Sequence, residues 1–247
     1  MAKTRLDVAL VERGLAETRA AAQRMVMAGL VFSNDKRLDK AGYGVASDTP
    51  LEVRGQPHPY VSRGGLKLEK ALDHFAIPVA GRVALDVGSS TGGFTDCLLQ
   101  RGAAKVYAVD VGTNQLAWKL RSDPRVVSME KTNIRDIGRT QIPEPIDIIV
   151  CDASFIGLRT ALPAALALAA PGAHLVALIK PQFEVGKGRV GKGGIVREPE
   201  LHREVCDTIA GWLDEQPGWR VLGVTESPIT GAEGNKEFLI CGLLSPR

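Results

Sequence analysis

Four charged residues recur beside apolar stretches of the sequence, in the order Lys, Asp, Lys, Glu. Lys67 stands in Ser-Arg-Gly-Gly-Leu-Lys, Asp152 in Cys-Asp-Ala-Ser-Phe, Lys180 in Leu-Ile-Lys-Pro-Gln and Glu237 in Gly-Asn-Lys-Glu-Phe. Charged groups beside such stretches are costly to bury without a partner. Each could be a surface charge or half of a structural ion pair, but together they form a candidate acid–base site.

A glycine-rich turn, Asp-Val-Gly-Ser-Ser-Thr-Gly-Gly, begins at Asp86. A dinucleotide-binding turn needs G-x-G-x-x-G, but Ser90 replaces the second glycine, which lets the backbone approach a pyrophosphate. The turn fits D-x-G-x-[GS]-x-G better, the loop that holds S-adenosylmethionine (SAM), which has no phosphate. Asp110 could accept both ribose hydroxyls and Asp136 could lie near the adenine, although an Asp at a strand end can also cap the next helix. The predicted cofactor contacts are Asp86, Gly88, Ser89, Ser90, Gly92, Gly93, Phe94, Thr95, Asp110 and Asp136.

The elements that must position these residues alternate between apolar strands and helices. We expect strands at 83–87, 105–110, 126–129, 146–152, 174–180, 219–226 and 237–243. Helices are expected through residue 99 and at 115–120, 158–170 and 199–214. This alternation predicts a parallel, doubly wound α/β sheet, which binds ligands beyond the carboxyl ends of its strands.

The first quarter of the chain predicts a separate small module. Leu6, Ala9 and Leu10 have helical spacing, Thr18 can cap a second helix, and short strands follow near 30–35 and 51–53. Residues 1–64 carry 10 Lys/Arg against 7 Asp/Glu, whereas the remainder carries 21 of each, so all of the net +3 charge lies there. A solvated helix surface would explain this charge, and so would RNA phosphate binding. The candidate phosphate contacts are Arg5, Arg19, Arg24 and Lys36.

A second basic segment, residues 180–197, carries five Lys/Arg against one acid. It nearly matches a phosphate loop, GxxxxGK[ST], but Gly193 replaces the Ser or Thr that binds magnesium. The pattern is consistent with a mobile, basic lid and equally with a flexible surface loop. In the first case Lys187, Arg189 and Lys192 would contact RNA.

Several classes of protein are disfavoured. No run of 18 apolar residues predicts a membrane-spanning helix, and the N-terminus lacks the apolar core of a signal peptide. The four cysteines are scattered and the four histidines lack metal-ligand spacing, so we expect buried free thiols, no metal and a cytoplasmic location. A monomer is favoured.

The four charged residues resemble the Lys-Asp-Lys-Glu tetrad of the FtsJ-like 2′-O-ribose methyltransferases, and residues 3–55 resemble the S4 RNA-binding domain. With the stretches that begin at Asp86 and Lys180, the sequence is similar to the TlyA (haemolysin A) family of rRNA cytidine 2′-O-methyltransferases. The resemblance implies a Rossmann-like SAM-dependent methyltransferase domain at 64–247, a linker at 59–63 and a small α+β S4-like domain at 1–58. It also implies SAM as cofactor and ribosomal RNA, or a ribosomal subunit, as partner.

Within this resemblance Lys180 is the candidate base that takes the proton of a ribose 2′-OH. Partial burial and the charge of Lys67 favour a neutral amine at this position, whereas Asp152 and Glu237 oppose it. Lys67 and Glu237 are expected to orient the ribose and Lys180. The alternatives are a non-catalytic ribosome-binding or assembly factor and, less readily, a haemolysin. A nicotinamide-dependent oxidoreductase is a further alternative, which is disfavoured because Ser90 breaks the dinucleotide-binding pattern.

Overall fold

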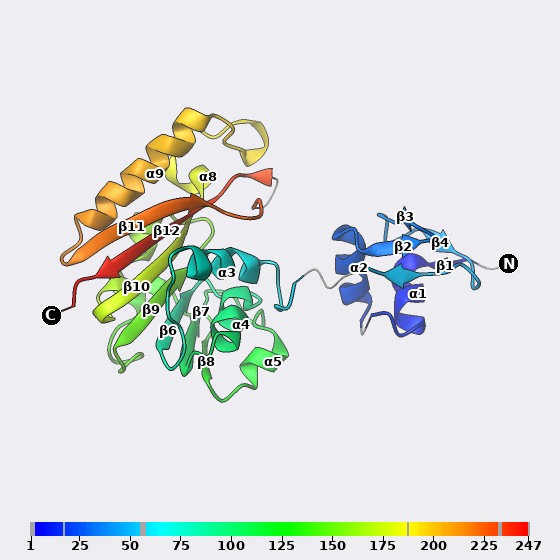
Figure 1. The fold of residues 1–247 in the computed structure, drawn as a ribbon, viewed down its shortest axis with the longest axis horizontal. Coiled ribbons are helices and arrows are strands. Elements are labelled where there is room, and N and C mark those ends of the chain that lie inside the picture. Colours follow the sequence, from blue (N-terminus) through cyan, green and yellow to red (C-terminus); the bar gives the residue numbers. More distant parts are fainter. Residues whose placement is uncertain (1–2, 17, 55–57, 187, 232–233, 247) are drawn as a thin grey trace. The chain divides into compact units, whose positions relative to one another are not determined.

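The computed structural model describes residues 3–16, 18–54, 58–186, 188–231 and 234–246. The chain divides into two compact units, residues 1–59 and 60–247 (Figure 1). The first unit begins with β1 (Thr4–Arg5) and two helices, α1 (Leu6–Glu12) and α2 (Arg19–Met27). The strands β2 (Val31–Ser33), β3 (Lys36–Arg37), β4 (Gly44–Val45) and β5 (Glu52–Val53) follow. β1 pairs with β4, and β2 pairs with both β3 and β5, all antiparallel.

The two helices of the first unit form where the sequence predicts them. Gly14 has a φ of +69°, a conformation that glycine adopts without strain, and it ends α1. The hydroxyl of Thr18 accepts a hydrogen bond from the amide of Ala21 and thereby caps α2. Apolar side chains from both helices and from β2 and β4 make a separate core, including Leu6, Leu10, Ala22, Val26, Val31 and Val45.

The second unit is built on a seven-stranded sheet of order β11-β12-β10-β9-β6-β7-β8. Five neighbouring strands are parallel: β6 (Val83–Val87), β7 (Lys105–Val109), β8 (Val126–Met129), β9 (Ile146–Cys151) and β10 (Ala169–Ile179). β12 (Phe238–Leu244) runs antiparallel to β10 and to the edge strand β11 (Trp219–Glu226). The sheet is therefore Rossmann-like, as predicted. It is not wholly parallel, however, which corrects the prediction of a parallel sheet, because β12 is antiparallel to both of its neighbours.

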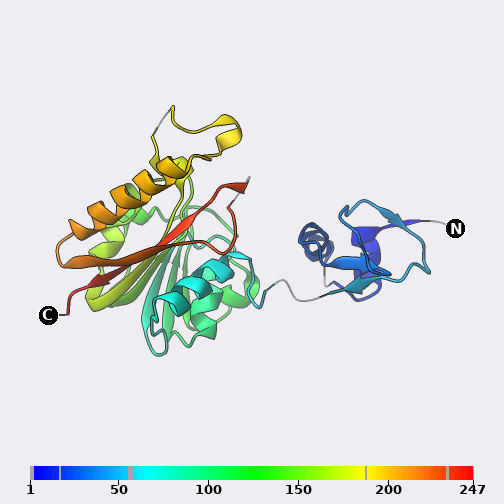
Figure 2. The same cartoon turned by 45° about the horizontal axis from the view of Figure 1, so that its top comes forward.

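Helices cover both faces of this sheet (Figures 1 and 2). α3 (Gly64–His74) and α4 (Gly93–Gln100) lie on one face, and α9 (Pro199–Asp214) lies on the other. Successive strand residues point to opposite faces, so Ile148 packs in the α3–α4 core and Ile149 in the α9 core. Burial on both faces explains why central strands such as β9 are almost continuously apolar, whereas the exposed residues of the edge strand β11 alternate with partly buried ones.

Two expected helices are shorter than the sequence pattern predicts. The segment 158–170 forms two single turns, α6 (Leu158–Ala161) and α7 (Pro163–Leu166), and β10 already begins at Ala169. Pro163 has no amide hydrogen to donate, so it begins a new turn instead of continuing α6. The helix expected at 115–120 is α5 (Trp118–Arg121). The remaining short turns are η1 (Ile134–Asp136), α8 (Pro181–Glu184) and η2 (Lys192–Gly194).

Candidate active site

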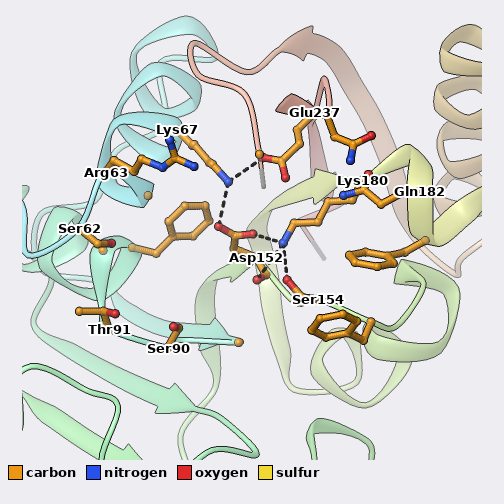
Figure 3. A pocket seen from close by; sticks show the side chains of 18 of the residues that line it. Ser62, Arg63, Lys67, Ser90, Thr91, Asp152, Ser154, Lys180, Gln182 and Glu237 are labelled. Carbon is orange, nitrogen blue, oxygen red and sulfur yellow. Dashed lines mark hydrogen bonds and ion pairs between the residues drawn. The ribbon is translucent and has the colours of Figure 1, made fainter. Parts of the chain in front are cut away.

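The four predicted catalytic residues form one connected network of ion pairs (Figure 3). Lys67 Nζ lies 2.7 Å from Glu237 Oε2 and 3.3 Å from Asp152 Oδ2. Lys180 Nζ lies 2.6 Å from Asp152 Oδ1. Lys67, Lys180 and Glu237 are each less than a tenth exposed, so water screens these charges weakly. Two ammonium groups and two carboxylates alternate, which balances the charge and makes their burial tolerable.

Three of the four residues reach this network because strand ends meet at one edge of the sheet. Asp152 directly follows β9, and Lys180 directly follows β10. Glu237 precedes β12, whose first residue, Phe238, pairs with the last residue of β10, Ile179. Since β12 is antiparallel to β10, its beginning lies at the same edge as the ends of the parallel strands. The antiparallel direction of β12 is thus what brings Glu237 to Lys67.

Lys67 reaches the network from α3, a helix that the strand-and-helix pattern did not include. The first turn of α3 packs closely on the beginning of α4: a Cβ atom on Gly93 would lie 2.3 Å from the Ser62 hydroxyl. A Cβ on Gly65 would likewise lie 2.3 Å from the ring of Tyr60. Glycine at both positions allows this approach, which sets Lys67 over the end of β9.

Lys180 is held by more than its carboxylate partner. Its Nζ donates a hydrogen bond to the Ser154 hydroxyl at 2.9 Å and approaches the backbone oxygen of Asp152 at 3.4 Å. Pro181 begins α8 directly afterwards, so the backbone turns away and the Lys180 side chain remains at the strand end. The chain segment after β9 therefore supplies all three oxygen neighbours of this ammonium group.

The glycine-rich turn directly follows β6 and lies beside the end of the neighbouring strand β9. Gly88 has a φ of +79°, and a Cβ there would lie 3.0 Å from Ala153 Cα. Gly88 therefore lets the turn pass directly over the segment that carries Asp152. The carboxylate of Asp110 accepts hydrogen bonds from the amides of Ser90 and Gly112, at 2.8 and 2.7 Å. Asp110 thus ties the turn after β6 to the loop after β7.

Asp86 differs from the other predicted cofactor residues because it lies wholly inside the sheet. Burial raises the pKa of Asp86 to about 7, although the hydroxyl of Thr95, which donates to its Oδ2 at 2.6 Å, counteracts part of this effect. Its side chain is 0% exposed and it does not line the pocket described next. Near neutral pH this group is a carboxyl as much as a carboxylate.

One pocket of about 640 Å³ joins the ion-pair network to the glycine-rich turn. It collects all four predicted catalytic residues and five of the predicted cofactor residues, Gly88, Ser89, Ser90, Gly93 and Phe94. Gly92, Thr95 and Asp110 support the turn from outside this lining. Asp136 lies on η1, is exposed, and is not part of the lining.

The pocket also contains residues that the sequence analysis did not single out: Ser62, Arg63, Ser154, Phe155, Gln182, Phe183 and Asn235. Most of them stand within one to three residues of a predicted catalytic residue, and that proximity was the available signal. Phe155 is the most unusual of them, because it is 92% exposed and has a φ of +66°. Bulky residues adopt that conformation only under strain. Its ring packs against Phe183, with ring centroids 5.4 Å apart.

In the first unit, two predicted RNA contacts share one buried acid. Arg5 Nε lies 3.0 Å from Asp7 Oδ1, and Arg19 Nε lies 2.8 Å from Asp7 Oδ2. The Asp7 side chain is 0% exposed, while about half of each arginine side chain remains exposed. The hydrogen bond from Arg5, assisted by those from Gln23 and Arg19, holds the pKa of Asp7 well below its usual range. Arg24 and Lys36 are exposed.

The second basic segment is anchored to α9 on one side. Both terminal nitrogens of Arg189 donate to the carboxylate of Glu204, at 2.5 and 2.6 Å. Arg189 thus has a partner within the chain, in contrast to Lys192, which is exposed on η2. Lys187 lies outside the described residues.

No helix among the described residues is both long and apolar enough to cross a membrane. No group of three His, Cys, Asp or Glu side chains in the described part of the chain is arranged to hold a metal ion. Cys97, Cys151 and Cys241 are buried free thiols, and Cys206 is a half-buried one.

Comparison with known proteins agrees with this geometry. Residues 60–243 match the family model of FtsJ-like methyltransferases, and residues 4–49 match that of the S4 domain. The chain is 54% identical over 239 residues to the putative rRNA methyltransferase YqxC of Bacillus subtilis, covering 96% of this chain and 85% of that one. It is 47% identical to the 16S/23S rRNA (cytidine-2′-O)-methyltransferase TlyA of Mycobacterium tuberculosis, covering 96% and 89%.

A solved structure, the putative hemolysin from Streptococcus thermophilus, is 47% identical with a TM-score of 0.77, covering 100% of this chain and 90% of that one. The matches extend over both units and include the segments that carry the ion-pair network. The chain therefore belongs to the TlyA (haemolysin A) family, in which an S4 domain precedes an FtsJ-like methyltransferase domain.

Proposed function

We propose that this chain transfers the methyl group of SAM to the ribose 2′-OH of a cytidine in ribosomal RNA. The observation that carries the proposal is the network of Lys67, Asp152, Lys180 and Glu237, which opens into the same pocket as the Gly88–Ser90 turn. Family membership supports the methyl transfer, and the cytidine-2′-O-methyltransferase of Mycobacterium tuberculosis, a 47% identical relative, supports the cytidine 2′-OH.

The turn after β6 suits SAM better than a dinucleotide. Ser90 stands where a dinucleotide-binding turn has the glycine that lets its backbone approach a pyrophosphate, and SAM has no pyrophosphate. Gly88, Ser89 and Ser90 would hold SAM, with Asp110 fixing the turn from behind through the Ser90 amide. When bound, SAM supplies a methyl group on a positively charged sulfur, which an oxygen nucleophile can attack directly.

The residues of the chain must then generate and align that oxygen nucleophile. A ribose 2′-OH holds its proton at neutral pH, so a base is needed as it attacks. Nζ of Lys180 is the atom that takes this proton, because Asp152 Oδ1 and Ser154 Oγ fix its position at the pocket wall. The amine must enter the reaction neutral and leave it as an ammonium group. The Asp152 carboxylate then stabilises the new charge at 2.6 Å.

Lys67 plays a different part because it lies between two carboxylates. Its single positive charge lies between the carboxylates of Glu237 and Asp152, offsets part of their negative charge and holds both in place. Without Lys67, the carboxylates of Glu237 and Asp152 would lose the cation that lies between them. We therefore assign proton transfer to Lys180 and alignment to Lys67 and Glu237.

The S4 unit supplies RNA affinity in this proposal. Its basic side chains Arg5, Arg19, Arg24 and Lys36 would contact phosphates, and Lys192 would do so from the methyltransferase unit. Such contacts depend on salt and carry little sequence information, so the methyltransferase pocket must select the nucleotide. With ribosomal RNA as the substrate, the cytoplasm is the expected place of action.

The decisive experiment maps 2′-O-methylation on both ribosomal RNAs from cells with and without the gene. Purified subunits from the deletion strain are then incubated with the protein and labelled SAM. We expect one or more cytidines to gain a mark that depends on the protein. If neither ribosomal RNA gains a mark, the chain is a ribosome-binding factor or acts on another RNA.

A further inference from the structure

The buried side-chain amide of Asn235 joins two segments of the pocket. One is residues 188–196, a part of the second basic segment that is called the basic segment below, and the other carries Glu237. Asn235 Oδ1 accepts a hydrogen bond from the Val196 amide at 3.1 Å, and its Nδ2 donates to the Gly194 oxygen at 3.0 Å. Asn235 is 3% exposed and Val196 is 2% exposed. Because one partner is a donor and the other an acceptor, both bonds require the same orientation of the amide. No other uncharged side chain of that size could make both bonds.

Each of the two segments is also held by a second contact, which does not involve the Asn235 side chain. The Val196 oxygen lies 2.9 Å from His202 Nε2 on α9, and the Asn235 oxygen accepts a hydrogen bond from the Gly231 amide at 2.9 Å. Gly231 in turn packs against the Glu237 carboxylate, since a Cβ there would lie 2.1 Å from its Oε1. The position of Asn235 therefore bears directly on that of Glu237.

From Glu237 a continuous set of contacts leads to the candidate base (Figure 3). Glu237 pairs with Lys67, Lys67 pairs with Asp152, and Asp152 pairs with Lys180. At the other end, Val190, Gly194 and Asn235 line the same pocket as these four residues. The basic segment is thus a wall of the pocket, and Asn235 is its attachment to the ion-pair network.

We infer that Asn235 is a positioning residue, which couples the placement of the basic segment to the alignment of Glu237 and Lys67. This inference rests on the proposed methyl transfer and deepens it: RNA that holds the basic segment in place also holds the network in its active arrangement. In this inference Asn235 acts through its two hydrogen bonds and not on the reacting oxygen or its proton. Its loss should therefore lower kcat with little effect on the affinity for SAM.

A matched control separates this coupling from simple loosening of the segment. Glu204 anchors the same segment through Arg189, but it lies at an exposed position of α9, and the ion pair and hydrogen bonds of its carboxylate go to Arg189 and not to Asn235 or the four network residues. Glu204→Ala should free the Arg189 end of the segment without disturbing Glu237, because Gly194 and Val196 stay bonded to Asn235. Asn235→Ala should free the Gly194 end of the segment and disturb Glu237 as well. Asn235→Asp keeps the acceptor for Val196 but sets a carboxylate oxygen against the Gly194 oxygen, so it should have the same two effects.

Two measurements on the full-length protein test the inference. Limited trypsin digestion, followed by mass spectrometry, reports cleavage after Arg189 and Lys192. We expect trypsin to cut each alanine variant about tenfold faster at these sites. Each variant loses hydrogen bonds that hold the segment: Asn235→Ala loses two buried ones, and Glu204→Ala loses the charge-assisted ones to Arg189. Initial rates on ribosomal subunits then give kcat and KM. Asn235→Ala should lower kcat about tenfold, whereas Glu204→Ala should keep the kcat of the unmodified protein.

The inference is overturned if Asn235→Ala retains full kcat, or if both alanine variants lose kcat equally, since loosening alone would then explain the loss. If Asn235→Ala does not fold by circular dichroism, the Asn235→Asp variant is judged by the same two criteria. Failure of the proposed function looks different: the unmodified protein would then methylate no ribosomal RNA, while the trypsin results would still report the attachment of the segment.

Discussion

Lys180 Nζ and Asp152 Oδ1 lie 2.6 Å apart at the ends of two neighbouring parallel strands, β10 and β9. The contact is short because parallel strands end at one edge of the sheet, so that the residue following each strand faces the same pocket. Asp152 also pairs with Lys67 through its other oxygen, and it thereby stands between two ammonium groups. This geometry distinguishes the roles of the two lysines and leads to the following predictions.

Replacing Lys180 by Met should remove the base while keeping much of the side-chain volume. We expect kcat for methyl transfer to fall by about 10²- to 10⁴-fold, the range that general bases contribute. Calorimetric SAM binding and filter-binding affinity for RNA should change by less than about threefold, since Lys180 lies in the network and not in the glycine-rich turn. Residual turnover above a few per cent would remove Lys180 from the role of base.

Replacing Ser154 by Ala should disturb the orientation of Lys180 without removing its amine. The Ser154 hydroxyl accepts one of the hydrogen bonds of Nζ, and in its absence the side chain has only the Asp152 contacts to fix it. We expect kcat to fall about tenfold and KM to stay within about twofold. Ser122→Ala, a change at an exposed position, is the control. A rise in KM at constant kcat would instead make Ser154 a substrate contact.

Replacing Asp7 by Asn should change how the side chains of Arg5 and Arg19 are oriented without changing the number of cationic side chains in the S4 unit. The Asp7 carboxylate holds Arg5 and Arg19, and the neutral amide cannot accept from both as strongly. RNA affinity should fall about tenfold, but the slope of log K against log salt concentration should be unchanged because no cation is lost. Arg19→Ala, by contrast, should reduce that slope by about one.

Melting curves of the Asp7→Asn variant must first show that the S4 unit still folds. If its salt slope falls as much as that of Arg19→Ala, the arginines need Asp7 for more than orientation. Unchanged RNA affinity in the folded variant would mean that neither arginine depends on this carboxylate.

The raised pKa of Asp86 predicts a specific dependence of stability on pH. In the unfolded chain Asp86 loses its proton near pH 4, whereas burial keeps the proton on the folded protein up to about pH 7. Between these values the folded state binds more protons, so its stability falls as the pH rises. Asp86→Asn removes this contribution, so its melting temperature relative to the unmodified protein should be higher at pH 8 than at pH 5. Calorimetry at the two pH values measures the difference, and an equal offset at both would show that Asp86 titrates normally.

Local patterns in the sequence determined much of this molecule. The Thr18 cap, the Gly14 stop and the helix α9 follow from short-range sterics and hydrogen bonding, which act in the same way wherever the segment lies. Continuous apolar strands predicted a sheet covered on both faces, and the positions of Asp152 and Lys180 after two of them predicted a shared site. Gly88 and Gly92 of the glycine-rich turn adopt positive φ values, which glycine reaches without strain, so this turn too follows from a local pattern.

Only the tertiary structure decided the rest, because strand direction and contacts between distant segments are not local properties. A parallel β12 would have placed Glu237 at the opposite edge of the sheet, and its apolar sequence fits either direction. Ser154 and Asn235 are ordinary polar residues in the sequence and gain their roles by meeting Lys180 and Val196 across 26 and 39 positions. Likewise, a basic pattern identified Arg5 and Arg19, but only folding placed both on one buried carboxylate.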